Sequence, residues 1–257
     1  MFSLDIVIWN YIEEFFYRLI YIITSFIITF IILFIYFEEI YELLMNPIIK
    51  LNYEDLQGFI YTDVTELLYT NIYVAFLFSF IIHLPIFSFH LWLFFNSSLN
   101  NYQKWHITTL LMFSMFLYVF SLIFAITILI PFSWNFFYYD EVRYISIQPR
   151  ISLFIYFSIK IILFSLLIFQ VPIIYFYCLF YGIYSTSFIS KNKSFILADV
   201  FFLVSLISPT DIISLIFIMV PLLGFYEVST LIYLYDREYR KILNMEINRP
   251  WGIIFDN

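Results

Sequence analysis

The stretch YIEEFFYRLIYIITSFIITFIILFIYF, Tyr11–Phe37, decides the fold of this chain. Its first part carries Glu13, Glu14 and Arg18, and no charged residue follows between Leu19 and Phe37. A helix rises about 1.5 Å per residue, so roughly 20 apolar residues cross the hydrocarbon core of a bilayer. We therefore predict a membrane-spanning helix over residues 19–37, preceded by a charged segment on the side of the membrane where the N-terminus lies.

The composition extends this prediction to the whole chain. Of its 257 residues 63% are apolar and only 12% are charged, which is typical of a polytopic membrane protein. No room remains for a separate water-soluble domain, so residues 1–257 are expected to form a single integral membrane domain. The formal net charge of −7 argues against nucleic acid as a partner, because nucleic-acid binding needs basic patches.

Five further apolar runs follow the first. They cover about 71–95, 107–132, 151–182, 195–207 and 212–235. The fifth span, with about 13 residues, reaches only about 20 Å as a helix and requires local thinning of the bilayer. We predict that Pro47 ends a helix in the acidic segment 38–70 and that the third span ends at Pro131. The expected fold is all-α, with six transmembrane helices of which the last two are short.

The distribution of Lys and Arg supports an even number of spans. Six spans place both termini on one side of the membrane, and eight of the twelve cations then fall on that side. Three lie on the other side, and Lys160 lies inside the fourth run. By the positive-inside rule, both termini face the matrix or cytoplasm.

The start of the chain carries no basic secretory signal and no Arg-rich transit peptide. Phe (35 residues) and Tyr (23) are abundant and Gly (4) is scarce, a skew typical of AT-rich codons. We therefore expect an organelle-encoded protein of the mitochondrial inner membrane. A plastid thylakoid membrane and a bacterial plasma membrane are the alternatives.

Ordered motifs along residues 10–235 resemble the TatC family of the twin-arginine protein translocase. YIEEFFYRL (Tyr11–Leu19) is similar to H-L-x-E-L-R-x-R-L, with Tyr11 in place of His and Phe16 in place of the first Arg. NPIIK (Asn46–Lys50) is similar to the A-P-L segment, and TDVTELLYTNIYVAF (Thr62–Phe76) to T-x-P-x-E-x-F. LPIFSFHLWLFF (Leu84–Phe95) is similar to P-x-x-x-Y-Q-x-W-x-F, with His90 in place of Gln.

Three more motifs follow in the family's order. FQVPI (Phe169–Ile173) resembles F-E-x-P-V with Gln170 in place of Glu. SPTDIISL (Ser208–Leu215) resembles T-P-P-D, and PLLGFYEVS (Pro221–Ser229) resembles P-x-x-x-x-Y/F-E. Each motif alone is weak, but together, in the family's order and with matching topology, they form a strong signal.

This resemblance implies a function without catalytic chemistry. A TatC-like protein binds the signal peptide of folded proteins and supports their transport, driven by the proton gradient. The implied partners are a single-span TatA-like protein, a TatB-like one, other TatC copies and folded cargo with an N-terminal signal. No cofactor or metal is expected, since no P-loop, HExxH, GxSxG or glycine-rich turn occurs.

The resemblance places a signal-peptide site at the N-terminal side of the membrane. Glu14 matches an acidic position suited to guanidinium groups, which bind carboxylates bidentately. Arg18, at i+4, orients Glu14 or serves as an ordinary positive-inside anchor. Phe94 belongs to the matching aromatic segment, and Gln103 stands where the family commonly has a second glutamate. Without the resemblance, Glu13 and Glu14 also fit a helix start favoured by the helix dipole.

The remaining polar candidates fall into two groups. Lys160, Gln170 and Glu227 are predicted inside the membrane or facing a groove, although Lys160 alternatively snorkels to an interface. Pro47, Glu66 and Asp211 are predicted to have structural roles on the far side, Asp211 as a helix cap.

Two other function classes remain open on the residues alone. A proton-channel subunit of a respiratory or ATP-synthase complex uses charged groups in mid-helix, and Lys160 is the one feature in its favour. A purely structural membrane subunit predicts that Glu14 can be replaced freely.

Overall fold

A computed structural model describes residues 2–49, 59–96, 99–139, 150–180, 193–205 and 212–242. Their secondary structure is helical, apart from one isolated bridge between Ile60 and Arg150. The elements are α1 (Phe2–Ile35), α2 (Phe37–Ile49), α3 (Val64–Asn96), α4 (Asn101–Phe124), the π-helix η1 (Ala125–Leu129), α5 (Ile130–Tyr139), α6 (Ile151–Phe180), α8 (Lys193–Ser205) and α9 (Ile212–Ile242).

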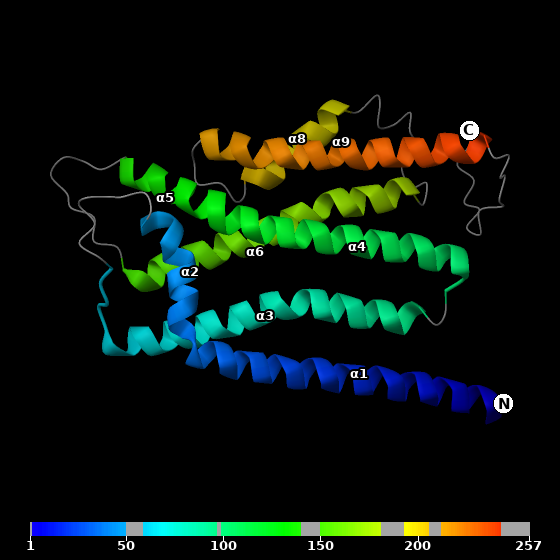
Figure 1. The fold of residues 1–257 in the computed structure, drawn as a ribbon, viewed down its shortest axis with the longest axis horizontal. Coiled ribbons are helices and arrows are strands. Elements are labelled where there is room, and N and C mark those ends of the chain that lie inside the picture. The colour runs from blue at the N-terminus through cyan, green and yellow to red at the C-terminus, as the bar shows by residue number, and fades with distance from the viewer. Residues whose placement is uncertain are drawn as a thin grey trace.

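The long helices lie side by side and α2 crosses them (Figure 1). The start of α1, the end of α3, the start of α4 and the end of α9 lie at one end of the bundle, here called the near end. The opposite, far end holds the end of α1, the starts of α3 and α6, and α5. The described ends of the chain therefore lie on the same side, as the positive-inside rule predicts.

Five helical stretches are long and apolar enough to cross a membrane. Within the described residues these are Tyr11–Ile35, Thr65–Asn96, Ile107–Asn135, Ile151–Cys178 and Ile218–Tyr235. Helix α8 corresponds to the fifth predicted span, and its 13 residues make it too short for a full crossing. The predicted apolar run ends at residue 235, whereas helix α9 continues to Ile242. Within α9, the 18 residues Ile218–Tyr235 form the stretch that is apolar enough to cross a membrane.

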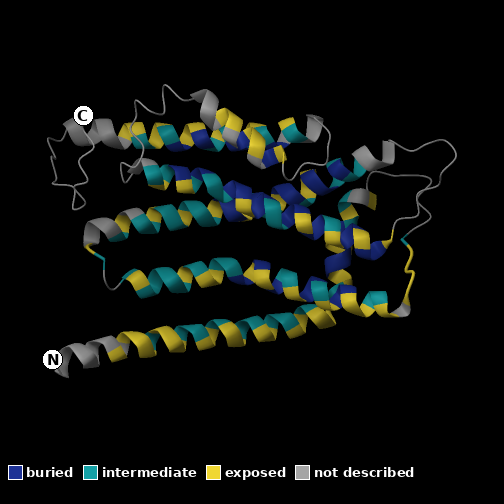
Figure 2. Ribbon diagram, turned by 180° about the vertical axis from the view of Figure 1, so that it is seen from behind, coloured by how far each residue is buried: buried dark blue, intermediate teal, exposed yellow. Residues whose placement is uncertain are grey.

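The core centres on α6, which packs against α3, α4 and α9. Its fully buried side chains include Ile155, Ile159, Ile162 and Phe169. Phe169 contacts Phe120 of the neighbouring α4, with ring centroids 5.6 Å apart. In contrast α1 packs on α3 at the edge of the bundle, and none of its apolar window is buried (Figure 2).

Helix α2 covers the far end of the bundle with its apolar face. Ile40, Tyr41 and Leu44 are buried, and the Tyr41 hydroxyl donates a 2.7 Å hydrogen bond to Oδ1 of Asn71 on α3. The prediction that Pro47 ends this helix is wrong by two residues, since α2 continues to Ile49. Pro47 has no N–H to bond the carbonyl of Leu43 one turn earlier, and the helix ends two residues after it.

The prediction that the third span ends at Pro131 is also wrong. Helix α4 passes through η1 into α5, which runs on to Tyr139. Pro131 has no backbone N–H with which to bond the preceding turn. That turn is the π-helix η1, in which the N–H of Ile130 donates to the carbonyl of Ala125, five residues earlier. The π-turn therefore lets the chain continue as a helix beyond the proline.

Candidate functional site: a groove at the near end of α1

A shallow, open groove of about 490 Å³ lies between α1 and α3 at the near end. Its lining comes from five residues of α1 and one of α3, namely Glu13, Glu14, Tyr17, Arg18, Tyr21 and His90. The α1 residues at 14, 17, 18 and 21 recur at three- and four-residue intervals, so they share one face of the helix. Helix α1 thus carries the polar groups, and α3 closes the groove with the His90 ring.

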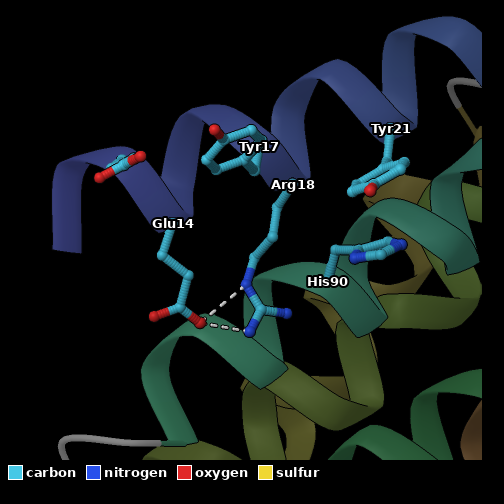
Figure 3. A pocket seen from close by; sticks show the side chains of 6 residues that line it. Glu14, Tyr17, Arg18, Tyr21 and His90 are labelled. Atoms are coloured by element: carbon cyan, nitrogen blue, oxygen red, sulfur yellow. Dashed lines mark hydrogen bonds and ion pairs between the residues drawn. The ribbon is translucent and has the colours of Figure 1, made fainter. Parts of the chain in front are cut away.

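Glu14 and Arg18 form an ion pair one helical turn apart (Figure 3). Nε of Arg18 donates a 3.1 Å hydrogen bond to Oε1 of Glu14, and the Nη2 group of Arg18 donates to the same oxygen. The side chains are partly exposed, 41% for Glu14 and 25% for Arg18. No residue in the described part of the chain donates a hydrogen bond to Oε2 of Glu14, so the ion pair with Arg18 occupies only one of the two carboxylate oxygens.

The aromatic segment of α3 packs next to this ion pair. The ring of Phe94 meets that of Phe15, the neighbour of Glu14, edge to face at 5.4 Å. The His90 ring lies beside Tyr21 (Figure 3), and its Nδ1 atom is buried without a hydrogen-bond partner in the described structure. The structure thus brings Glu14, Arg18 and Phe94 together and adds His90.

A second polar layer joins α1 to α3 deeper in the membrane. His83, only 4% exposed, lies with Nε2 3.0 Å from the Ser25 hydroxyl and Nδ1 3.4 Å from the Thr29 hydroxyl. Nδ1 also lies 2.9 Å from the carbonyl oxygen of Ser79. Ser25 follows Arg18 by seven residues and His83 precedes His90 by seven, so this layer lies two turns below the groove.

Gln103 lies in the first turn of α4, at the near end of the bundle. Its backbone is therefore at the same end as Glu14, and its side chain falls outside the described part of the structure. The predicted proximity of the Gln103 side chain to Glu14 stays a prediction.

The predicted intramembrane residues are not among those that line the groove. Gln170 of α6 bonds with Ser114 of α4: the Ser114 hydroxyl donates to Oε1 at 2.9 Å, and Nε2 donates to the Ser114 carbonyl at 3.4 Å. Lys160 is exposed on α6, with Nζ 5.9 Å from the centre of the Phe164 ring. Glu227 is exposed on α9.

The far-end candidates have structural surroundings where they are described. Glu66 accepts hydrogen bonds from the backbone N–H and the hydroxyl of Thr62, both at 2.9 Å, and from the hydroxyl of Ser152 at the start of α6. It also accepts a 3.4 Å bond from the N–H of Asp63, which precedes α3, and so provides one of the two bonds of a capping box there. Pro47 is half-buried in α2, and Asp211 lies outside the described residues.

Sequence reasoning missed Tyr17, Tyr21 and His90 as members of the groove. The two tyrosines could have been found, because they share the helical face of Glu14 and Arg18. His90 could not, because its position depends on how α3 packs against α1. The described residues hold no cluster of three His, Cys, Asp or Glu side chains suited to a metal. The groove offers carboxylates and aromatic rings, which together suit a cationic ligand.

Comparisons with known proteins agree with this geometry. Residues 10–221 match the family described as "Sec-independent protein translocase protein (TatC)". A TatC of that description from Rickettsia prowazekii is 31% identical over 227 residues, which cover 87% of this chain and 90% of the relative. An uncharacterized tatC-like protein, ymf16, of Reclinomonas americana is 28% identical over 88% of this chain and 86% of its own length.

The solved structures lead to the same family. A crystal structure of the twin-arginine translocase receptor TatC superposes with a TM-score of 0.67 at 25% identity, covering 86% of this chain and 98% of that chain. The matches support a protein translocase and not the proton-channel alternative. The ordered motifs, the helical bundle and a family match over most of the chain agree, and the chain belongs to the TatC family of Sec-independent protein translocase proteins.

Proposed function

We propose that the groove at the near end receives the cationic part of the signal peptide of a folded protein. Through that contact the chain acts as the receptor subunit of a translocase driven by the proton gradient. The observation that carries this proposal is the Glu14 carboxylate at the edge of the groove, whose Oε1 binds Arg18 while Oε2 has no donor in the described part of the chain. An incoming guanidinium can use Oε2 without first breaking the Glu14–Arg18 pair.

The surroundings of Glu14 favour a cation over an anion. Glu13 adds a second carboxylate to the groove, so two negative charges stand against the single charge of Arg18. Tyr17 and Tyr21 offer ring faces on which a guanidinium group stacks favourably. Partial burial of Glu14 strengthens such a pair relative to one in bulk water.

Gln103 limits the electrostatic strength of this site. An amide oxygen accepts a hydrogen bond from guanidinium but carries no full charge. Recognition therefore rests on Glu14, and we expect the accepted signals to depart from a strict Arg-Arg pair. Phe94 supports the site by packing on Phe15, beside Glu14.

The partners and the membrane location belong to the same proposal. Residues 1–257 form one integral membrane domain that works with a single-span TatA-like protein, a TatB-like one and other TatC copies. The codon-related skew toward Phe and Tyr supports the mitochondrial inner membrane. Lys160, Gln170 and Glu227 are proposed to serve inside the membrane away from this groove, and Pro47, Glu66 and Asp211 to have structural roles on the far side.

Photocrosslinking in energised membranes tests the proposal. A photoreactive residue at Tyr17 should form an adduct with a signal peptide that carries arginine, and one at exposed Leu43, on α2 at the far end, should form none. Replacing a single arginine of the peptide by lysine should leave most of the adduct. Absence of the Tyr17 adduct would remove the site, and complete loss with one lysine would remove the relaxed specificity.

A further inference from the structure

Lys160 is a cation placed deep in an apolar helix on its exposed side. It follows Ile151, the first residue of α6, by nine residues, which places it about 14 Å along the helix. That is close to half of the roughly 30 Å hydrocarbon core. The opposite side of α6 is the buried centre of the bundle, so Lys160 points away from the protein's own core.

The surroundings of Lys160 form a regular, uncovered surface on α6. Leu153, Lys160, Leu167 and Ile174 follow one another at seven-residue intervals and are all exposed, Leu167 at 67% and Ile174 at 61%. Residues seven apart lie on nearly the same face of a helix, which is the spacing that a second helix uses for packing. We call these four residues the Lys160 face.

The ammonium group of Lys160 lies beside an aromatic ring. Its Nζ atom is 5.9 Å from the centre of the Phe164 ring, one turn along the same helix. Among the described residues no carboxylate pairs with Lys160, whose charge is costly in lipid unless it has a partner.

We propose that the Lys160 face is the docking surface for a transmembrane helix of another protein that carries a carboxylate at the depth of Lys160. A carboxylate on a neighbouring helix would neutralise the ammonium group, and Leu153, Leu167 and Ile174 would supply apolar packing on both sides of the pair. This goes beyond the signal-peptide site, since that groove lies on α1 and α3 at the near end.

Glu227 and Glu66 of a second copy of this chain lie too far along the bundle axis to supply that carboxylate. Copies related by rotation about the membrane normal keep every residue at its own depth. Glu227 lies beside Tyr226, whose ring meets Tyr175 of α6 at 4.9 Å, so Glu227 is about 22 Å along α6 from Lys160. Glu66 bonds to Ser152, about 12 Å from Lys160 in the other direction.

Site-specific photocrosslinking in native membranes tests this surface. A photoreactive residue at Leu167 should yield an adduct with one membrane protein that has an acidic residue within its spanning segment. The control is the same probe at Phe116, which is exposed on α4. Lys160→Met should lower the Leu167 adduct at least fivefold, and Lys160→Arg, which keeps the charge, should keep it within twofold. Membrane levels of both variants are measured alongside.

Charge exchange decides whether the two charges meet. Lys160→Glu should abolish the adduct, and replacing the partner's acidic residue by lysine in that background should restore it. A Leu167 yield no higher than at Phe116, or an unchanged yield in Lys160→Met, would overturn the proposal. So would an adduct between two copies of this chain, or a partner without an intramembrane carboxylate. Signal-peptide adducts at Tyr17 are scored separately, so the two proposals fail independently.

Discussion

Nε2 of His83 lies 3.0 Å from the hydroxyl oxygen of Ser25, and this contact joins α3 to α1 inside the membrane. It matters because α1 buries none of its apolar window in the bundle, and this polar contact adds to the ring contacts Phe15–Phe94 and Phe26–Phe76 that join the two helices. The same two helices form the groove one heptad nearer the surface, where Arg18 and His90 lie. The contact therefore contributes to how the Glu14 side of α1 faces α3.

Replacing His83 by leucine should loosen α1 without leaving new unsatisfied hydroxyls. The hydroxyls of Ser25 and Thr29 keep their bonds to the carbonyls of Ile22 and Phe26. Hydrogen bonds between membrane helices contribute on average about 0.6 kcal/mol each, so the variant should lose about 1 kcal/mol of unfolding free energy. Unfolding in mixed micelles measures this, and the signal-peptide adduct at Tyr17 should fall in parallel.

Ser88→Ala is the matched control for that experiment, because the Ser88 hydroxyl bonds to the carbonyl of Leu84 in its own helix. It should change neither the unfolding free energy nor the adduct appreciably. An unchanged adduct in a destabilised His83→Leu protein would show that the layer stabilises the bundle without positioning the groove.

Glu14→Gln should weaken binding of an arginine-bearing signal peptide about tenfold or more. Hydrogen bonds to charged groups contribute about 1.5–3 kcal/mol, and 1.4 kcal/mol corresponds to a factor of ten in affinity. Binding of a labelled peptide to the purified protein in lipid discs measures the change. Glu39→Gln, an exposed carboxylate of α2 at the far end, serves as control and should keep wild-type affinity. Equal losses in both variants would point to general membrane electrostatics.

The sequence was sufficient for the elements that depend on local pattern. Long uncharged runs predict spanning helices, and the four-residue spacing of Glu14 and Arg18 anticipates their ion pair. It was insufficient where distant segments meet. His83 and Ser25 are 58 residues apart, and Glu66 and Ser152 are 86 apart, so both contacts depend on helix packing. Pro131 was misjudged because a π-turn, which has no apolar signature, absorbs its effect.

Arg18→Gln should strengthen peptide binding about twofold. Arg18 occupies Oε1 of Glu14 in the free protein, and a partly exposed pair at this spacing contributes about 0.3–0.5 kcal/mol. Its removal frees the second oxygen and removes a like charge from the groove. The peptide-binding assay measures this, with Lys104→Gln at the start of α4 as control. Weaker binding in Arg18→Gln would instead show that Arg18 orients Glu14 for the ligand.

Gln103→Glu should raise the affinity for a peptide with two arginines and make it more selective. A second full carboxylate at the near end gives the second guanidinium a charged partner. The affinity ratio between Arg-Arg and Lys-Arg peptides should increase, and added salt should weaken binding more steeply than in the wild type. An unchanged ratio would place Gln103 out of reach of the bound peptide.

Gln170→Glu should destabilise the bundle even though the two side chains have the same size. In the wild type Oε1 accepts from the Ser114 hydroxyl while Nε2 donates to the Ser114 carbonyl. In the glutamate variant a carboxylate oxygen takes the place of Nε2 and faces the Ser114 carbonyl oxygen, so two acceptors meet without a proton between them. A buried polar group that loses its partner costs about 1–3 kcal/mol. The melting temperature in detergent should fall, whereas Gln170→Met combined with Ser114→Ala, which removes both side-chain partners, should stay closer to wild type. If Gln170→Glu were as stable as the wild type, the reciprocal bonding with Ser114 would not be what holds α6 to α4 at this level.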